Sequence, residues 1–285
     1  MREGVLNIAL VGAGNVATHL GRAWHTAGVN VAQVYSRNYA HAKALAKALD
    51  AEALSSLEAL DVSVDAVVFC LKDDAYEQVL AGISLSGTLL LHTSGSLERG
   101  VLARASERVG VLYPLQTFSK HKDLDLSSVP LLLETAKEAD KPVVSALAAK
   151  ISSHVLFVSP EQRATLHLSA VFCCNFVNYL YVVAEELLIP KGLEMDLIRP
   201  LIMETARKVM TGSPAAVQTG PARRNDRTVI EKHRLSLADS PSYQVLYDVL
   251  TAHILRKYSG GDAEIAESKS DNGEKSTVSS GEYLP

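Results

Sequence analysis

Short apolar runs alternate with amphipathic stretches over the first 158 residues. The amphipathic stretches include residues 16–27 and 40–49, where apolar side chains recur at helical spacing. Apolar strands that alternate with helices are typical of βαβ units. The pattern predicts an α/β fold, with a doubly wound parallel Rossmann sheet and helices on both of its faces. The predicted strands lie in the apolar runs 7–11, 31–35, 65–71, 88–92, 109–113, 129–133 and 154–158.

The pattern changes after Pro160. Residues 161–188 form one long helical stretch without glycine or proline. Further helices are expected over 195–211, after an N-cap at Asp226, and over 242–258. We therefore expect two domains, a Rossmann domain over residues 1–158 and a smaller all-α domain over 159–258. Residues 259–285 are rich in Glu, Ser, Lys, Asp and Gly, and this composition predicts a disordered tail.

Composition bears on partners and location. The 285-residue chain is 47% hydrophobic and has a formal net charge of −4. This charge provides no strong positive field to attract a nucleic acid or an anionic membrane, so a small soluble partner is expected. No apolar run approaches the roughly 20 residues of a membrane span, and a signal peptide is not predicted. The three cysteines, Cys70, Cys173 and Cys174, lie in apolar runs, so we expect them to be buried and reduced in a cytoplasmic protein.

The strongest motif follows the first apolar run. Residues 8–17 fit a buried strand, a G-x-G-x-x-A turn and the start of a helix. Gly12 allows the tight turn, Gly14 lets the backbone approach a pyrophosphate, and Ala17 keeps the helix close to the sheet. The N-terminus of that helix offers free N–H groups and a partial positive charge to phosphates. The predicted dinucleotide contacts are Gly12, Ala13, Gly14, Asn15 and Val16.

The second predicted strand ends without the acid that an NAD site uses. An Asp or Glu about 20 residues beyond the last glycine normally binds the ribose 2′-hydroxyl of NAD. Here the sequence is Tyr35-Ser36-Arg37-Asn38. Ser36 and Arg37 can instead bind a 2′-phosphate, so NADP is the predicted cofactor. The alternative is that Arg37 is only a solvated residue at the end of a strand.

Later loops are expected at the carboxyl edge of the same sheet, where ligands bind in open α/β folds. The backbone at Leu71 and Lys72 should pass close to a ribose, whereas the Lys72 side chain fits a solvated loop lysine. The Thr93-Ser94-Gly95 segment suits close approach to a nicotinamide amide or a substrate carboxylate, unless it is only a turn that caps a helix. Gln116, on the next polar loop, is a candidate substrate contact.

The long helix carries a polar cluster on an otherwise apolar surface. His167, Cys174 and Asn178 fall on one stripe, with Asn175 about 80° away on its flank. A cleft explains such a cluster better than a core does. His167 is the best candidate general acid, because imidazole can deliver a proton to a carbonyl or imine as hydride arrives. A structural role is the alternative, since a lone histidine on a helix is usually structural.

Two arginines follow a rigid Thr219-Gly220-Pro221 turn. Arg223 and Arg224 come shortly before the predicted N-cap at Asp226. Arg224 would then lie near a helix N-terminus, where it suits an anionic substrate or a cofactor phosphate. A solvated basic turn is the alternative. No metal-ligand cluster is predicted.

Together these residues resemble a family of bacterial Rossmann-like oxidoreductases whose C-terminal part is a domain of unknown function, the 2520 family. The resemblance covers about residues 5–253. The family is related to pyrroline-5-carboxylate reductase, prephenate dehydrogenase, ketopantoate reductase and the deazaflavin-dependent NADP reductases. The matching residues are Gly12–Val16 with Thr18–Leu20, His92–Gly95, Pro114–Phe118, His167 with Asn175, and Thr219–Pro221 with Arg224 and Asp226.

The resemblance implies an NADP-binding domain, a helical domain like that of 6-phosphogluconate dehydrogenase, and a homodimer. It does not identify a substrate. One position departs from the family, which commonly has histidine before the proline of the Pro114 motif, whereas this chain has Tyr113. If that histidine acts in the relatives, either Tyr113 replaces it or the role lies elsewhere, which favours His167.

Two functions are consistent with these features. The first is an NADP(H)-dependent oxidoreductase that transfers a hydride between the nicotinamide and a small, anionic carbonyl or imine substrate. His167 would donate the proton, and Asn175 would hold the carbonyl or imine. The alternative is a non-catalytic NADP(H)-binding sensor whose helical domain docks a partner. A polar cluster at His167 and Asn175 favours the enzyme, whereas an apolar cleft with an exposed apolar patch would favour the sensor.

Overall fold

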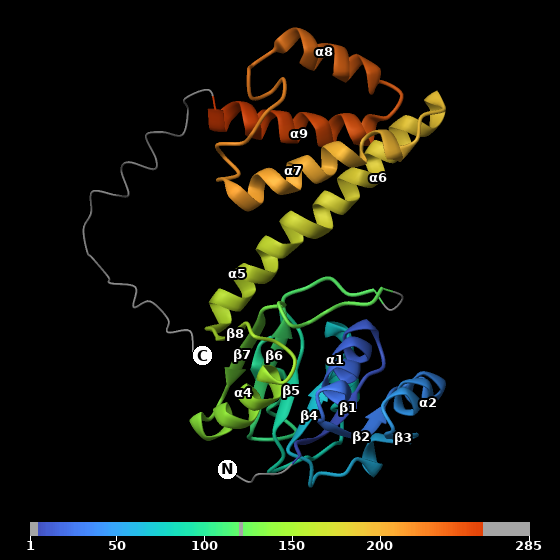
Figure 1. Ribbon diagram of the computed structural model, residues 1–285, viewed down its shortest axis with the longest axis vertical. Helices are drawn as coiled ribbons and strands as arrows, with labels where there is room; N and C mark the ends of the chain where they lie inside the picture. The colour runs from blue at the N-terminus through green and yellow to red at the C-terminus, as the bar shows by residue number, and fades with distance from the viewer. Residues whose placement is uncertain (1–4, 120–121, 259–285) are drawn as a thin grey trace, which may run out of the picture. The chain divides into compact units, whose positions relative to one another are not determined.

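The computed structural model describes residues 5–119 and 122–258 (Figure 1). The chain divides into two compact units, Met1–Asn178 and Tyr179–Pro285. The boundary between them falls inside the long helical stretch, whereas the sequence pattern places it at residue 158, where the sheet ends. The predicted tail, 259–285, lies outside the described residues.

An eight-stranded sheet forms the centre of the first unit, in the order β3-β2-β1-β4-β5-β6-β7-β8. The predicted Rossmann fold is confirmed. Each predicted apolar run contains a strand, and the short β3 was not predicted. The strands are β1 (Asn7–Val11), β2 (Asn30–Tyr35), β3 (Glu52–Leu54), β4 (Ala66–Phe69), β5 (Leu90–His92), β6 (Val109–Pro114), β7 (Leu131–Thr135) and β8 (Val155–Phe157).

The sheet is mostly parallel, with one reversal. Strand β7 pairs antiparallel with β6, with Leu112 opposite Leu133, and β8 then runs parallel to β7. The expectation of a wholly parallel sheet is therefore wrong at this edge. A parallel return requires a crossover, usually a helix. The described residues between β6 and β7 contain no helix, so the chain enters β7 in the opposite direction.

Side chains that alternate along the strands form a core on each face of the sheet. Ile8 and Leu10 pack on one face with α1 (Asn15–Thr26), α2 (Tyr39–Ala48) and α4 (Lys141–Ala149). Ala9 and Val11 pack on the other face with α3 (Tyr76–Val79) and the 3-10 turns Leu57–Ala59 and Arg99–Leu102. This two-faced burial explains why the strands are almost continuously apolar. It also leaves the carboxyl ends of the strands open for loops.

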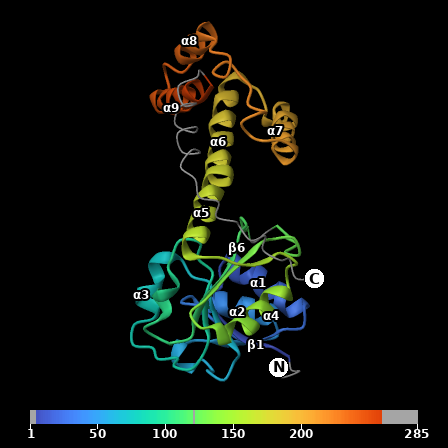
Figure 2. The ribbon, with the colours of Figure 1, turned by 90° about the vertical axis from the view of Figure 1, so that its left-hand side faces the viewer.

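The helical part of the chain follows β8. A capping box at Ser159 and Gln162 starts α5 (Pro160–Ala170), which continues through a π-helical turn (Val171–Phe176) into α6 (Val177–Leu188). Helices α7 (Arg199–Thr211), α8 (Arg227–Ser236) and α9 (Pro241–Tyr258) follow (Figure 2). The predicted N-cap at Asp226 is confirmed, since its side chain accepts a hydrogen bond of 3.1 Å from the Val229 amide.

One helical run, Pro160–Lys191, is long and apolar enough to cross a membrane by length and composition. Its most apolar 18-residue window has a mean hydropathy of 1.5, and none of that window is buried. No span was predicted from the sequence, because no uninterrupted apolar run is long enough. Polar side chains such as Asn175 and Asn178 interrupt this run without lowering its mean hydropathy below that of a membrane helix.

Candidate active site

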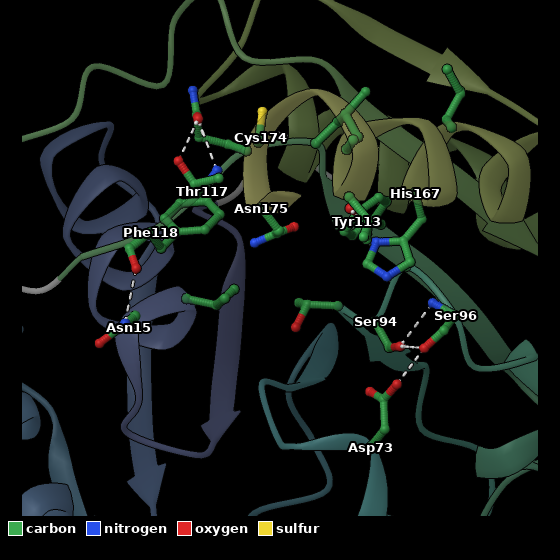
Figure 3. Close-up of a pocket in the computed structure, with 18 of the residues that line it drawn as sticks. Asn15, Asp73, Ser94, Ser96, Tyr113, Thr117, Phe118, His167, Cys174 and Asn175 are labelled. Atoms are coloured by element: carbon green, nitrogen blue, oxygen red, sulfur yellow. Dashed lines mark hydrogen bonds between the residues drawn. The ribbon is translucent and has the colours of Figure 1, made fainter. Parts of the chain in front are cut away.

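A pocket of about 940 Å³ opens at the carboxyl edge of the sheet (Figure 3). All its lining residues belong to the first unit. They come from the fingerprint turn and the start of α1, the loops after β4 and β5, the end of β6 and the loop after it, the end of α5 and the π-helical turn. The predicted site residues in the lining are Gly14, Asn15, Val16, Leu71, Lys72, Thr93, Ser94, Gly95, Gln116, His167 and Asn175.

The fingerprint turn has the geometry of a phosphate cradle. Gly12 has a φ of 116°, and a Cβ there would collide with the carbonyl oxygen of Cys70. Gly14 has no atom within 4 Å of where a Cβ would stand, and it faces the pocket. No side chain caps the N-terminus of α1, so its first N–H groups can bind an anion. Gly12 and Ala13 are buried behind this surface rather than in the lining.

The loop after β6 is fastened to the start of α1. The Asn15 side-chain amide donates to the Phe118 carbonyl at 2.9 Å, and His19 Nε2 donates to the Ser119 carbonyl at 3.0 Å. Figure 3 shows Asn15 and Phe118 on the same side of the pocket. Because the Asn15 amide is engaged in this bond, its backbone N–H is the group left for a phosphate. The sequence analysis did not identify Phe118 as a lining residue.

Ser36 and Arg37 lie at the end of β2, outside the pocket lining. The Gly12 amide donates to the Tyr35 carbonyl at 2.7 Å, which places the end of β2 beside the fingerprint turn. Ser36 is half-buried and Arg37 is exposed. Arg37 forms no ion pair with any residue in the described part of the chain. Its guanidinium is therefore available at the position where a 2′-phosphate is expected.

The loop after β5 is organised by its own hydroxyl groups. Ser94 Oγ accepts hydrogen bonds of 3.1 Å from the amides of Ser96 and Leu97. The Ser96 hydroxyl in turn donates to the Asp73 carboxylate, from the loop after β4. The Ser94 side chain therefore stabilises the turn of this loop, as the alternative to a ligand-binding role predicts. Thr93 and Gly95 also line the pocket, while Lys72 is exposed at its edge.

His167 meets the sheet at the end of α5. Its Nδ1 lies 2.9 Å from the Tyr113 hydroxyl, and the two rings meet edge-on. Figure 3 shows the His167 ring on the same side of the pocket as Ser94 and Ser96. His167 therefore lines the pocket together with Gly14 and the Thr93-Ser94 loop, as the proton-donor hypothesis requires.

The π-helical turn changes which side chains enter the pocket. In a regular α-helix, Asn175 would lie about 80° from His167. The turn Val171–Phe176 is π-helical, with more residues per turn than an α-helix, which reduces this angle. Asn175 accordingly lines the pocket, and Asn178 does not belong to the lining. Cys173 and Cys174 are exposed there, so the expectation that all three cysteines are buried holds only for Cys70.

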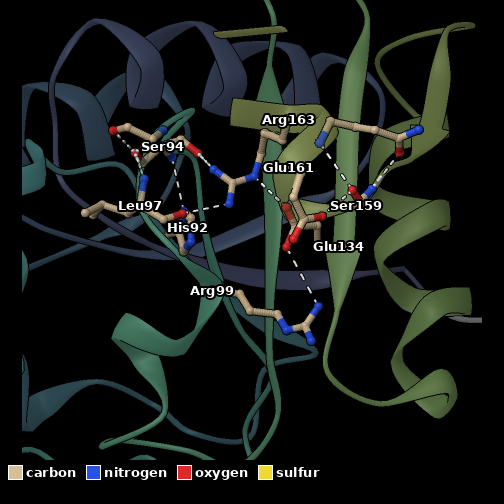
Figure 4. A network of polar contacts seen from close by, with 10 residues as sticks. His92, Ser94, Leu97, Arg99, Glu134, Ser159, Glu161 and Arg163 are labelled. Carbon is tan, nitrogen blue, oxygen red and sulfur yellow. Dashed lines mark hydrogen bonds and ion pairs between the residues drawn. The ribbon is translucent and has the colours of Figure 1, made fainter. Parts of the chain in front are cut away.

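A buried ion pair supports this end of the pocket (Figure 4). Arg163 is 1% exposed, and its Nε donates to Glu134 Oε1 on β7 at 2.6 Å. The same guanidinium donates to the carbonyls of Ser94 (3.1 Å) and Leu97 (2.7 Å). Arg163 therefore joins α5, the sheet and the Ser94 loop one helical turn before His167. Nothing local in the sequence signalled this role.

Two of the predicted substrate contacts, Gln116 and Arg224, differ from expectation in the structure. Gln116 lines the pocket, but its side-chain oxygen accepts from the Thr117 amide at 2.8 Å. Arg224 belongs to the second unit, where it is exposed in the turn before α8. No cluster of metal-ligating side chains occurs among the described residues.

Comparisons with known proteins identify the family. Residues 7–94 match the family described as NADP oxidoreductase, coenzyme F420-dependent, and residues 129–254 match a domain of unknown function, DUF2520. A solved structure from Bacteroides fragilis, BF3122, described as an NADP oxidoreductase, is 39% identical with a TM-score of 0.82. The match covers 88% of this chain and 98% of that one. The chain belongs to this family of Rossmann-like NADP oxidoreductases.

More distant structures share the fold of this NADP oxidoreductase. Protein TM1727 from Thermotoga maritima is 23% identical, with a TM-score of 0.66, over 92% of this chain and 99% of that one. A reductive aminase from Aspergillus terreus, solved with NADPH and ethyl-5-oxohexanoate, is 18% identical with a TM-score of 0.65. That match covers 90% of this chain and 96% of the aminase. No curated protein matches the sequence.

A matched pair of glycine variants tests the cradle of this oxidoreductase. Gly12→Ala should lower the free energy of unfolding by about 1–3 kcal/mol, because it combines a positive φ with a backbone collision. Gly14→Ala should leave stability unchanged, since its methyl group enters open space. The Gly14→Ala substitution should weaken NADPH binding by about tenfold or more, because its methyl group would occupy the space in which the cofactor phosphates are expected to bind. Urea unfolding and calorimetric titration measure the two effects, and equal NADPH affinity in wild type and Gly14→Ala would contradict this assignment.

His92 gives the oxidoreductase a pH-dependent stability. Burial, reinforced by the positive charge of Arg163, lowers the pKa of His92 from 6.5 to about 4. Between these values the unfolded chain binds a proton that the folded chain does not, so the free energy of unfolding falls as pH falls. The contribution of His92 across this range is about 3 kcal/mol.

The substitution His92→Asn isolates this contribution. Asparagine can still accept the hydrogen bond that the Ser94 amide donates to His92 Nδ1 at 3.2 Å, but it does not titrate. Urea unfolding at pH 7, 5.5 and 4 should show a shallower loss of stability in the variant than in the wild type. Parallel pH dependences in the two proteins would contradict this prediction, because they would mean that folding does not lower the pKa of His92.

Proposed function

We propose that the protein transfers a hydride between NADP(H) and a small carbonyl or imine substrate held beside His167. The observation that supports this proposal most strongly is that the expected cofactor site and the candidate catalytic side chains line one pocket. It combines the uncapped helix N-terminus behind Gly14 with an imidazole at His167 and an amide at Asn175. A phosphate cradle and a proton donor within one pocket are what hydride transfer to a C=O or C=N group requires.

In this mechanism each group of residues in and beside the pocket has a distinct role. NADP(H), when bound, supplies or accepts the hydride. The first turn of α1 binds the pyrophosphate, and Ser36 with Arg37 binds the 2′-phosphate. Leu71, Lys72, Thr93 and Ser94 contact the ribose and nicotinamide, with Gln116 and Gly95 beside the substrate.

Proton transfer belongs to the opposite wall of the pocket. In the direction of reduction, His167 delivers a proton to the substrate oxygen or nitrogen as the hydride reaches carbon. Asn175 holds the same substrate atom by donating a hydrogen bond from its amide. In the reverse reaction, His167 accepts the proton.

The substrate class has specific support. The reductive aminase and imine reductase of Aspergillus terreus, which share this fold, were solved with ketone, imine or amine ligands. The pocket offers room and hydrogen-bond donors for a carbonyl or an imine. The proposed anionic character depends on Lys72, whose side chain is exposed at the pocket edge. A non-catalytic sensor is not favoured, because the pocket is polar at His167 and Asn175 and the family consists of oxidoreductases.

The proposal includes a homodimer in the cytoplasm. Large apolar side chains of the second unit are exposed, among them Leu197, Leu201, Met210, Leu235 and Val245. Apolar surface on this scale marks an interaction site. We assign it, together with the apolar side of α6, to a second copy of this chain rather than to a membrane, because Glu185 and Glu186 interrupt the apolar run near the end of α6.

Substitutions on this surface test the dimer. The wild type should have a molar mass twice the chain mass of 30.6 kDa by light scattering. Leu201→Glu combined with Met210→Glu should shift the protein to monomers or to a weaker dimer, because two charges would be buried without partners. Val62→Glu, at an exposed apolar residue of the first unit, serves as the control and should remain dimeric. A monomeric wild type would refute the dimer.

Cofactor choice tests the role of Arg37. Removing a charge-assisted hydrogen bond costs about 1.5–3 kcal/mol, so Arg37→Ala should weaken NADPH binding by about 10- to 100-fold. NADH binding should not change, because NADH lacks the 2′-phosphate. Lys47→Ala, which removes an exposed positive charge from the last turn of α2, is the matched control. Calorimetry that shows unchanged NADPH affinity in Arg37→Ala would rule out this contact.

The role of His167 is tested with a panel of keto acids and imines and NADPH oxidation as the readout. His167→Ala should leave NADPH affinity unchanged and lower kcat by about 10²–10⁴-fold, the usual cost of losing a general acid. Asn175→Ala should mainly raise KM. Wild-type turnover in His167→Ala would contradict this assignment and would mean that another group donates the proton.

A further inference from the structure

Tyr113 has no role in the mechanism proposed above, yet it contacts the proposed proton donor directly. It is the second-last residue of β6 and 8% exposed, and it also lines the pocket. Its hydroxyl lies 2.9 Å from His167 Nδ1, and the ring centroids are 5.8 Å apart at an interplanar angle of 76°. This hydrogen bond joins a strand to a helix across 54 residues of sequence.

Gly95 fixes the two rings from the other side. A Cβ at Gly95 would overlap His167 Nδ1 and would lie 2.6 Å from His167 Cγ and 2.8 Å from Tyr113 Cζ. The backbone of the loop after β5 is therefore in direct contact with both rings. That loop is itself held by Arg163 through the Ser94 carbonyl. The edge of the imidazole that carries Nδ1 is thus enclosed by Tyr113 and Gly95.

The charged and titratable groups around the pair are few. Arg163 lies one helical turn before His167 and is paired with Glu134 from β7, while Cys174 approaches from the π-helical turn. Lys72 and Asp73 line the same pocket from the loop after β4. Burial raises the pKa of the Tyr113 hydroxyl, and Arg163 opposes this effect only in part. The phenol is therefore neutral at physiological pH.

A neutral hydroxyl can both donate and accept a hydrogen bond. When His167 is protonated, its Nδ1–H donates to the Tyr113 oxygen and its Nε2–H is the proton available to the substrate. After Nε2 has released its proton, the neutral ring keeps the Nδ1 proton and the same hydrogen bond to Tyr113. A carboxylate in the same place would only accept and would favour the charged ring. The hydroxyl therefore keeps the imidazole in one orientation before and after proton transfer.

We propose that Tyr113 is a positioning residue for His167, which holds Nδ1 so that Nε2 alone exchanges protons with the substrate. The inference deepens the proposed function and depends on His167 being the proton donor. The ligand class for Nε2 is the oxygen or nitrogen of a carbonyl, imine or their reduced products.

Nitrogen NMR tests the pair without substrate or cofactor. In protein labelled with ¹⁵N-histidine, the signals that disappear in His167→Gln belong to His167. When the ring is neutral, they should show the remaining proton on Nδ1 and an unprotonated Nε2. Tyr113→Phe should shift the Nδ1 signal, because the acceptor of its hydrogen bond is lost. Tyr76→Phe is the control, since it removes another buried tyrosine hydroxyl, bonded to the Phe69 carbonyl at 3.0 Å, and should leave His167 unchanged.

Turnover separates this inference from the proposed function. With a substrate from the NADPH screen, Tyr113→Phe should lower kcat by about tenfold or more and leave KM and NADPH affinity close to wild type, a smaller loss than removal of the acid itself. Gly95→Ala perturbs the same rings from the opposite side and should reproduce the shifted Nδ1 signal. If His167→Gln is inactive while Tyr113→Phe keeps wild-type His167 signals and kcat, the positioning role is wrong and the proposed function stands. If His167→Gln retains full turnover, both fail.

Discussion

The ion pair between Arg163 and Glu134 is the interaction on which the rest of the site depends. Both residues are buried, at 1% and 2% exposure, and removal of one partner from such a pair typically costs about 3–5 kcal/mol. A buried guanidinium must find acceptors in every direction. Here the acceptors are a β7 carboxylate and two carbonyls of the loop after β5, so one side chain fixes how α5 starts against the sheet.

The functional groups take their places from that anchor. His167 follows Arg163 by one helical turn, so its ring stands over the loop that the guanidinium holds. The π-helical turn then carries Asn175, which lines the same pocket as His167. Gly95 leaves just enough room for the imidazole and the Tyr113 ring. The side chains proposed for proton transfer are therefore positioned by rigid elements, while the cofactor cradle is formed separately by the first βα turn.

The cofactor cradle is thus structurally separate from the wall of the pocket that we propose acts on the substrate. The cradle behind Gly14 needs only backbone geometry and an uncapped helix. The opposite wall depends on side chains from β6, α5 and the π-helical turn, and a substitution there would alter the proposed proton donor without disturbing the cradle. Tyr113 is such a position.

The sequence by itself determined the features that arise from local patterning. Apolar runs predicted seven of the strands, the fingerprint predicted the cradle, and Asp226 predicted a helix start, because each depends on neighbours in the chain. The short β3 and the reversed β7 escaped prediction, since pairing and direction are set between distant strands. Only the tertiary structure brought Tyr113 to His167, buried Arg163 against Glu134 and placed Asn175 in the pocket lining, because these features join residues far apart in the chain or depend on a π-helical turn that local patterning does not signal.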